Sequence, residues 1–215
     1  SGGSGNRVIT QKIFYRKKTG GTWSAPTELY SLTSTTDSNL IGHRPFSELR
    51  IAVDAQDNPH IAWVFGGANT ASCDGWNGNE IYAVSFDGTA WLPPVNVSNN
   101  ATYSYFLDIA ADTAGNVHFV WIDGRTFEAN SCTSSGTRTV YHGIRFANGD
   151  FSDAAPVVDA LYYGNYPALC GGQNGKMHLI FTNSSKEMEY TSWDQGQWAA
   201  PEVVSPVAGD YYYKD

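Results

Sequence analysis

Oxygen-bearing side chains crowd one glycine-rich segment of the sequence, residues 65–80. Asp74, Asn77, Asn79 and Glu80 lie within it, and carboxylate and amide oxygens are the ligands that calcium prefers. The cluster therefore predicts a calcium site, with a solvated turn as the alternative interpretation. The sequence indicates no other cofactor.

Other residues in and near these loops suit acid–base chemistry on sugars. Asp74 or Asp123 paired with Glu128 would supply the two carboxylates of a glycoside hydrolase. His43 beside Arg44 would instead suit elimination from a polysaccharide, with the histidine as base and the guanidinium neutralising a uronate. His43, Arg44 and Glu128 are thus the catalytic candidates, and the spacing leaves open whether any catalysis occurs.

Aromatic residues gather around positions 103–106, 162–166 and 211–213. Sugar rings stack on aromatic faces while neighbouring polar groups bind their hydroxyls. This pattern predicts a carbohydrate site, and packing of the same rings at the inner edges of the sheets is the alternative. The candidate ligand-binding residues are Asp74, Trp76, Tyr103, Tyr105, Arg125, Tyr162 and Tyr163.

The cysteines divide into a candidate pair and a single residue. Cys73 and Cys132 follow Trp63 and Trp121 by ten and eleven residues, so they occupy equivalent loops. A disulfide between them would imply an oxidising compartment. Cys170 falls within an apolar run, which predicts a small buried residue.

Three histidines at a regular interval reveal an internal repeat. His60, His118 and His178 are separated by 58 and then 60 residues. Around each, a turn of the Asp-Asn, Gly-Asn or Asn-Gly kind separates two apolar runs, the pattern of a β-hairpin. Equivalent positions of a repeat lie far apart, so we interpret these histidines as structural rather than as ligands of one metal.

A second hairpin follows each first one and carries an aromatic residue after its turn. Four strands in a unit of roughly 40 to 60 residues are typical of a β-propeller blade, which buries its faces against its neighbours. We therefore predict an all-β propeller with three complete four-stranded blades and an N-terminal half blade made of the third and fourth strands. An eight-stranded sandwich is the alternative. The aromatic residues predicted to fill the spaces between blades are Trp23, Trp91, Phe151 and Trp198.

The domain boundaries follow from the repeat. Residues 1–6 read as a flexible linker or cloning remnant, and residues 7–215 as a single partial propeller. The blades are predicted at about 7–30 (the half blade), 40–97, 105–158 and 166–204. Because known propellers have roughly four to eight blades, we expect a second copy, a complementary chain or a longer parent to complete this one.

The repeat resembles that of the sialidase-like, or BNR-repeat, propellers of secreted proteins. The segments that carry the resemblance are the Asn-x-His-x-x-Trp runs within 57–63 and 115–121, and the degenerate Asp boxes at 85–91 and 192–198. The resemblance implies a propeller fold in a secreted protein. Sialidases of this fold share an arginine triad, a Tyr–Glu nucleophile pair and an acidic acid/base, and the arginine nearest to that pattern is Arg50.

The overall charge narrows the classes of partner. A formal charge of −8 disfavours nucleic acid, whose binding needs clustered Lys and Arg, and no apolar run approaches the roughly 20 residues that span a bilayer. The sequence thus predicts an extracellular or cell-surface, lectin-like module that binds glycans or adheres, completed by self-association or by a partner chain. The alternatives are a structural subunit of an extracellular assembly and a carbohydrate-active enzyme, a hydrolase or a lyase.

Overall fold

The computed structural model describes residues 7–36, 46–66, 79–100, 104–124, 138–158, 166–183 and 185–205. These residues form β-strands and one short 3-10 turn, η1 (Gln173–Gly175), so the predicted all-β class is confirmed for them. No helix among them is long and apolar enough to cross a membrane.

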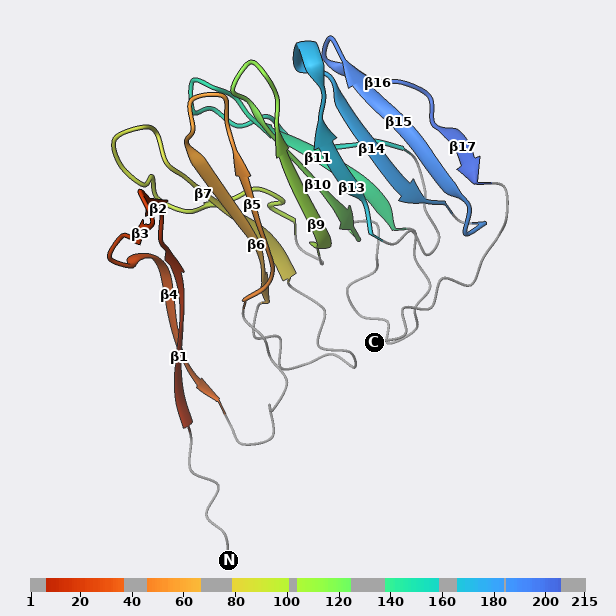
Figure 1. The fold of residues 1–215 in the computed structure, drawn as a ribbon. Helices are drawn as coiled ribbons and strands as arrows, with labels where there is room; N and C mark the ends of the chain where they lie inside the picture. Colours follow the sequence, from red (N-terminus) through yellow and green to blue (C-terminus); the bar gives the residue numbers. More distant parts are fainter. Residues whose placement is uncertain are drawn as a thin grey trace, which may run out of the picture.

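Antiparallel sheets follow one another along the chain (Figure 1). An N-terminal pair, β1 with β4, precedes three larger sheets. The first sheet has the order β5-β6-β7-β8 and the second β9-β10-β11-β12, while in the third β13-β14-β15 is extended by β16 and β17, which both pair with β15. The strands are β1 (Arg7–Tyr15), β2 (Lys18–Thr19), β3 (Thr22–Trp23), β4 (Thr27–Thr36), β5 (Phe46–Val53), β6 (Pro59–Gly66), β7 (Asn79–Ser85), β8 (Val95–Asn96), β9 (Ser104–Ala111), β10 (Val117–Asp123), β11 (Thr139–Arg145), β12 (Ala155–Pro156), β13 (Ala168–Gly171), β14 (Met177–Thr182), β15 (Met188–Asp194), β16 (Gln197–Trp198) and β17 (Glu202–Ser205).

The first two strands of each larger sheet form the predicted hairpin. In the second sheet Ile109 pairs with Phe119, and the corresponding positions pair in the other two sheets. The connecting turns contain a residue with positive φ, namely Asp57 (62°), Gly115 (85°) and Gly175 (76°). Only glycine takes this conformation without steric penalty, and Asn or Asp tolerate it best among the others, which is why these residue types identified the turns in the sequence.

Neighbouring sheets pack face to face through hydrophobic clusters. We call the contact of the N-terminal pair with the first sheet the first junction, and those of the first with the second and the second with the third sheet the second and third junctions. Trp63, Trp121 and Phe181 occupy equivalent positions and are 0%, 0% and 2% exposed. Each faces the preceding sheet, at the first, second and third junction respectively. Burial of such large apolar side chains is the dominant force holding the sheets together.

The aromatic residue after the second hairpin packs on the preceding sheet, as predicted, at three of its four positions. The Trp91 ring lies 5.0 Å from the Tyr15 ring across the first junction, and Phe151 packs against the cluster of the second junction. Trp198 Nε1 donates to His142 Nδ1 across the third junction at 3.2 Å.

Two residues predicted to be buried lie instead on the surface. Trp23 is 54% exposed, with the cationic groups of Arg16 and Lys18 at 5.8 and 5.9 Å from its ring centre. Cys170 is exposed, although the equivalent Ala110 packs in the third junction. Both corrections have one cause: no described sheet lies before the N-terminal pair or beyond the third sheet to cover these faces.

An aspartate organises the turn of the first hairpin in two of the three sheets. Asp54 Oδ1 accepts the backbone N–H groups of Gln56 (2.9 Å) and Asn58 (2.8 Å), and its Oδ2 lies 3.2 Å from His60 Nε2. Asp112 repeats the arrangement in the second sheet, with its Oδ2 at 3.4 Å from His118 Nε2. These contacts stabilise the turn, in agreement with a structural role for the repeated histidines.

The third sheet lacks this aspartate, and its histidine bonds elsewhere. Gly172 stands where the other sheets have aspartate, and a Cβ built there would lie 2.6 Å from His178 Nε2. His178 Nδ1 instead lies 2.7 Å from the hydroxyl of Tyr190, on the adjacent strand β15. The glycine therefore leaves the space that the histidine ring occupies.

The residue beside the histidine on the third strand also varies among the sheets. His142 fills this position in the second sheet and bonds His118, as Tyr190 bonds the histidine of the third sheet. Ala83 fills it in the first sheet, and the buried Nδ1 of His60 has no hydrogen-bond partner among the described residues.

A directional chain of hydrogen bonds crosses the third junction. Trp198 Nε1 can only donate, so His142 Nδ1 is the acceptor and its Nε2 carries the proton that bonds His118 Nδ1 at 2.9 Å. His118 Nε2 then donates to Asp112. Both rings are neutral in this arrangement. Burial, together with repulsion from His118 when that ring is protonated, lowers the pKa of His142 to about 3.

Candidate functional site

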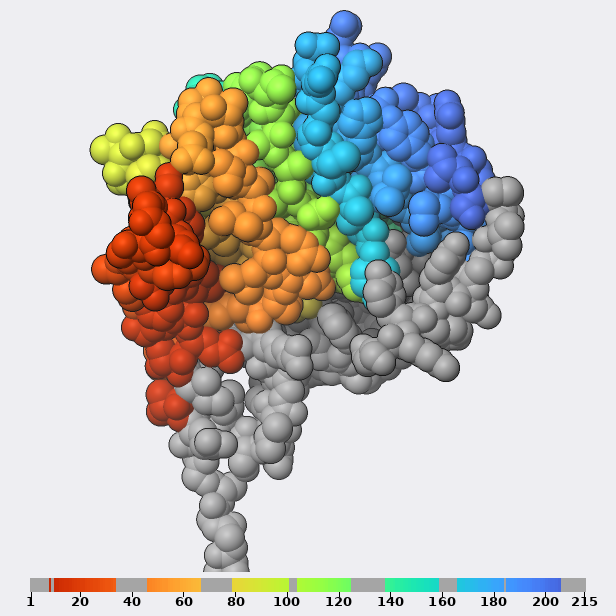
Figure 2. Space-filling model, viewed as in Figure 1, coloured from red at the N-terminus to blue at the C-terminus, as the bar shows by residue number. Residues whose placement is uncertain are grey.

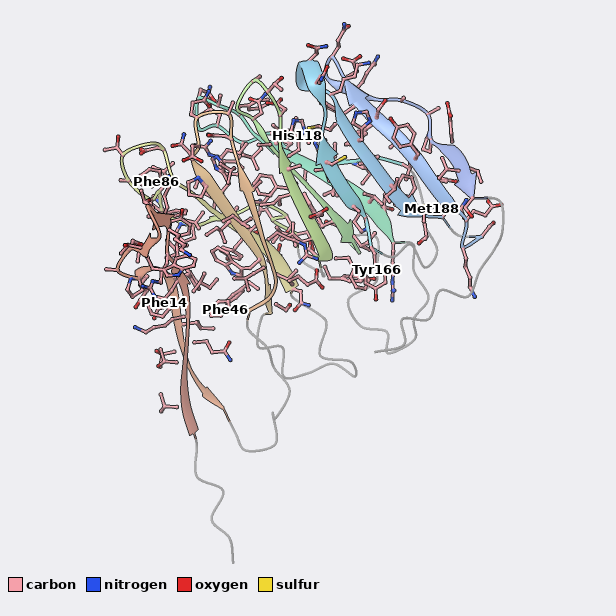
Figure 3. All side chains as sticks on the ribbon, in the orientation of Figure 1. Phe14, Phe46, Phe86, His118, Tyr166 and Met188 are labelled. Carbon is pink, nitrogen blue, oxygen red and sulfur yellow. The ribbon has the colours of Figure 1, made fainter. Side chains whose placement is uncertain are left out.

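The most distinctive backbone geometry lies at the starts of the innermost strands β5, β9 and β13. Glu48, Phe106 and Tyr166 occupy equivalent positions, and all three have positive φ, at 51°, 55° and 57°. Such a conformation costs a bulky residue about 1–3 kcal/mol and is concentrated at functional sites. Figure 3 shows Tyr166 at the end of its sheet opposite to His118, so this end is distinct from the one with the Asp–His turns. We call it the inner-strand site.

In the first and second sheets, bulges in the strand pairing accompany this geometry. The register of β5 with β6 shifts between Ser47 and Arg50, and that of β9 with β10 shifts at the equivalent place. A bulge leaves residues out of the ladder. The backbone N–H of Leu107, released in this way, donates to the Glu48 carboxylate of the preceding sheet at 2.8 Å.

Side chains of one innermost strand thus bind the backbone of the next. The carboxylate of Asp108 accepts the N–H of Leu169 at 2.8 Å, as Glu48 accepts that of Leu107. Arg50 Nε lies 3.6 Å from Asp108 Oδ1. The inner-strand site is therefore fixed by contacts between sheets as well as within them.

The Glu48 carboxyl sits in a partly buried environment. Burial raises its pKa, and this effect outweighs the lowering by the N–H groups of Leu107 and Phe106 and by the charge of Arg50. Perturbed pKa values are concentrated at functional sites, although here the hydrogen bonds of the carboxyl also hold two strands together.

Aromatic rings form a row from the third junction to the surface. The rings of Tyr105 and Phe106 lie 4.5 Å apart, and those of Phe106 and Tyr166 lie 4.3 Å apart. Tyr105 is buried at 6% exposure, whereas Tyr166 is 54% exposed. The guanidinium of Arg138 lies 5.6 Å from the Tyr105 ring centre. The row thus presents a ring at the surface that is supported from beneath by two others.

A second polar cluster lies at the second junction. The Asp123 carboxylate, 1% exposed, accepts hydrogen bonds from Trp121 Nε1 and from Asn100 Nδ2, each at 2.9 Å. Ser98 donates to Glu80, and the Asn100 backbone N–H lies 3.3 Å from the same carboxylate. Burial is the main reason that the pKa of Glu80 is raised. These groups form hydrogen bonds with one another, which indicates a structural role.

The structure describes only some of the residues predicted to form a site. Tyr105 lies in the aromatic row, Asn79 is buried at the start of β7, and Glu80 lies in the second-junction cluster. Tyr105 is thus too buried for its ring to form the surface of a sugar site. The predicted residues outside the described residues are His43, Arg44, Cys73, Asp74, Trp76, Asn77, Tyr103, Arg125, Glu128, Cys132, Tyr162 and Tyr163.

Metal binding is not evident in the described part of the chain. No three or more His, Cys, Asp or Glu side chains there form a group that could hold an ion. Two of the four predicted calcium ligands, Asp74 and Asn77, fall outside it, so calcium stays a prediction.

Several residues of the inner-strand site were not identified as site residues from the sequence. Asp108 and Arg138 gave no signal, and Arg50 was singled out only for its likeness to the sialidase pattern. The Arg50–Asp108 pair joins two sheets across 58 residues of sequence, which no local pattern reveals. Tyr166 could have been identified from its place in an aromatic-rich segment before the third repeat.

No protein-family model and no curated protein matches the chain. Among solved structures it is similar to the Hadza microbial sialidase Hz136, with 6% identity and a TM-score of 0.49, over 82% of this chain and 45% of the sialidase. It is also similar to a fucose lectin from Kordia zhangzhouensis, with 11% identity and a TM-score of 0.43, over 74% of this chain and 99% of the lectin. A third similar structure is the lectin of Aleuria aurantia. Its sequence identity is 12% and its TM-score 0.34, over 94% of this chain and 80% of the lectin.

This chain spans less than half of the sialidase's length. All three TM-scores are below 0.5 and all three identities are at most 12%. At this distance the similarities assign the chain to no family and no activity.

Proposed function

We propose that this chain is an extracellular glycan-binding module built as part of a β-propeller, in which each four-stranded sheet is one blade. Two consecutive four-stranded antiparallel sheets, a third sheet of five strands, and their face-to-face packing support the blade interpretation. The sugar binds at the inner-strand site, on the side where the loops between sheets begin.

The exposed ring of Tyr166 is the observation that carries this proposal. It is 54% exposed and is backed by Phe106 at 4.3 Å, while its backbone is held in a conformation that is unfavourable for tyrosine. A fixed aromatic face beside carboxylate and guanidinium groups can stack on a pyranose ring and bind its hydroxyls. Asp108 of the neighbouring strand β9 supplies a carboxylate, which binds the Leu169 N–H at 2.8 Å, and Arg50 of β5 lies 3.6 Å from that carboxylate.

Calcium bound by Asp74, Asn77, Asn79 and Glu80 and a disulfide between Cys73 and Cys132 remain parts of the proposal. Both would fix the loops that border the inner-strand site. Secretion is proposed with them, since a disulfide requires an oxidising compartment.

A glycan array followed by calorimetry with the strongest ligand tests the proposal. We expect Tyr166→Ala to weaken binding about 10-fold, because loss of a stacking ring removes on the order of 1 kcal/mol. Phe14→Ala is the matched control: Phe14 is exposed to nearly the same degree, 53%, but lies on β1, and its loss should leave the affinity unchanged.

Absence of binding to every glycan on the array, or an equal loss in both variants, would contradict the proposal. The same glycans incubated with the native chain and analysed for released products distinguish a binding module from a hydrolase or a lyase. Intact glycans support binding alone.

A further inference from the structure

Side-chain hydrogen bonds run without a break from the third sheet into the second. Trp198 donates to His142 at 3.2 Å, and His142 is joined to His118 at 2.9 Å. His118 in turn lies 3.4 Å from Asp112. We call these four residues the junction chain. In Figure 2 the strands β9 (green) and β13 (light blue) lie against each other at the same junction.

Both ring nitrogens of His118 and of His142 are used in the junction chain. Trp198 Nε1 is a donor that cannot accept, so it fixes the direction of every other bond. A neutral imidazole has one donor and one acceptor nitrogen, whereas a protonated ring has two donors. One added proton, wherever it is placed, therefore leaves two donors facing each other in the chain.

His118 is the ring that takes up such a proton first. Burial lowers its pKa, and the facing carboxylate of Asp112 opposes this effect. Burial lowers the pKa of His142 to about 3, and no carboxylate among the described residues opposes it there. A positive charge on His118 is thus balanced by an anion, whereas one on His142 is not.

We propose that the junction chain is an acid-sensitive latch, in which protonation of His118 breaks the hydrogen bond between Trp198 and His142 across the third junction. One proton enters from solvent at His142 Nδ1, while the proton on His142 Nε2 passes to His118 Nδ1. His118 then carries both ring protons and a positive charge opposite Asp112. His142 stays neutral with its proton on Nδ1, which faces the N–H of Trp198, so the bond between the sheets is lost. This proposal does not depend on the binding of sugar.

The other two repeated histidines lack this property. His178 bonds the hydroxyl of Tyr190, which can turn from donor to acceptor, so protonation of His178 costs no hydrogen bond. His60 Nδ1 has no hydrogen-bond partner among the described residues. Burial and, to a smaller extent, the charge of Arg145 also lower the pKa of His60. Within the described sheets the latch therefore belongs to the third junction.

The charges that act on the junction chain come from the second sheet. Among the described residues they are Asp112, which faces His118, and His118 itself, which faces His142. The third sheet contributes the uncharged rings of Trp193 and Trp198. Its ion pair of Lys176 with Asp194 is 48% and 45% exposed, so solvent and salt screen it. The response to acid is thus governed by the chain itself.

Nitrogen NMR of the full chain, isotope-labelled at histidine and tryptophan, tests the latch. The His142 signals are those missing in His142→Phe. We expect the ring proton of His142 to move from Nε2 to Nδ1, with the ring still neutral, as the pH falls from about 7.5 to about 4.5. Solvent exchange of the Trp198 indole hydrogen should rise about 10-fold relative to that of Trp121, which bonds Asp123. Circular dichroism verifies the fold at each pH.

His118→Gln removes the group that takes up the proton, so the exchange of Trp198 relative to Trp121 should no longer depend on pH. His60→Gln is the matched control, since His60 occupies the equivalent position and both histidines are 1% exposed; it should keep the native response. The proposal would be overturned by a His142 proton that stays on Nε2, by the same response in both variants, or by equal acceleration of both indole hydrogens. The tautomer of His142 in the native chain decides the question even where His118→Gln does not fold.

Discussion

The first and second sheets have the same topology but differ in the hydrogen bonding of two buried side-chain nitrogen atoms. In the second sheet Trp121 Nε1 bonds Asp123, and His118 Nδ1 bonds His142. The first sheet has Trp63 and His60 at these positions, and their corresponding nitrogens have no hydrogen-bond partner among the described residues.

One residue in each case accounts for the difference. Phe65 stands where the second sheet has Asp123, and Ala83 stands where it has His142. Phe65 joins a cluster of rings with Tyr30 and Phe46. The same backbone thus accommodates two kinds of junction. An apolar junction tolerates an unpaired N–H group, whereas in a polar junction each buried polar group needs a hydrogen-bond partner.

The largest effect should come from removing the carboxylate of the polar junction. Asp123→Leu leaves Trp121 Nε1 and Asn100 Nδ2 without this acceptor, and we expect the free energy of unfolding to fall by about 3 kcal/mol. Phe65→Leu, the matched change in the first sheet, should cost about 1 kcal/mol. Urea denaturation measures both, and equal losses would remove the distinction between the two junctions.

Acid should act on the sheets through their buried histidines. Burial lowers the pKa of His60, His118 and His142 in the folded chain, so below their unfolded pKa of about 6.5 the unfolded chain binds more protons. Stability should therefore be complete above about pH 6.5 and fall as the pH decreases. The steepest loss should be about 1.4 kcal/mol per pH unit for each histidine.

His142→Phe tests which junction carries this dependence. Because His142 has the pKa lowered to about 3, its removal should reduce the loss of stability between pH 7 and pH 4.5, measured by denaturation at each pH. An unchanged slope would mean that the third junction does not control the response to acid.

The two tryptophans offer a smaller but closely matched test. Both Trp63→Phe and Trp121→Phe remove the same atoms from equivalent buried positions. We expect the second change to lower the unfolding free energy by about 1–2 kcal/mol more than the first, since only Trp121 donates to a buried carboxylate. Thermal denaturation of the two variants gives the comparison, which the opposite order would refute.

The smallest effect is expected at Glu80. Its pKa is raised in the folded chain, so the ionised form opposes folding above its unfolded pKa of about 4.3 and does not do so below it. Glu80→Gln should leave stability unchanged or raise it by less than about 1 kcal/mol at pH 7, with no gain at pH 4. A marked loss at pH 7 would show that the charge itself is needed.

Local sequence signals predicted the elements that local chemistry controls. The hairpins around His60, His118 and His178 were identified because turn residues and apolar runs act over a few neighbouring positions. The aspartates Asp54 and Asp112 lie in two of these turns and bind their backbone N–H groups.

Local sequence signals could not predict the contacts between sheets. The positive φ of Phe106 accompanies a bulge whose released N–H group, on Leu107, bonds Glu48, 59 residues away in sequence. The burial of Cys170 was predicted wrongly for the same reason, because exposure depends on whether another sheet covers the strand. Most residues of the predicted site fall outside the described residues, so the predicted site is untested.

Gly172 restricts which residues of the other two repeats can be substituted into the third. Gly172→Asp alone would not recreate the Asp–His turn of the other sheets, because the new Cβ would meet His178 Nε2. The ring would first have to give up its bond with Tyr190. The effects of substitutions at these three positions are therefore interdependent, and their order matters: Tyr190→Ala followed by Gly172→Asp is an accessible route, whereas the reverse order passes through a chain with a steric clash.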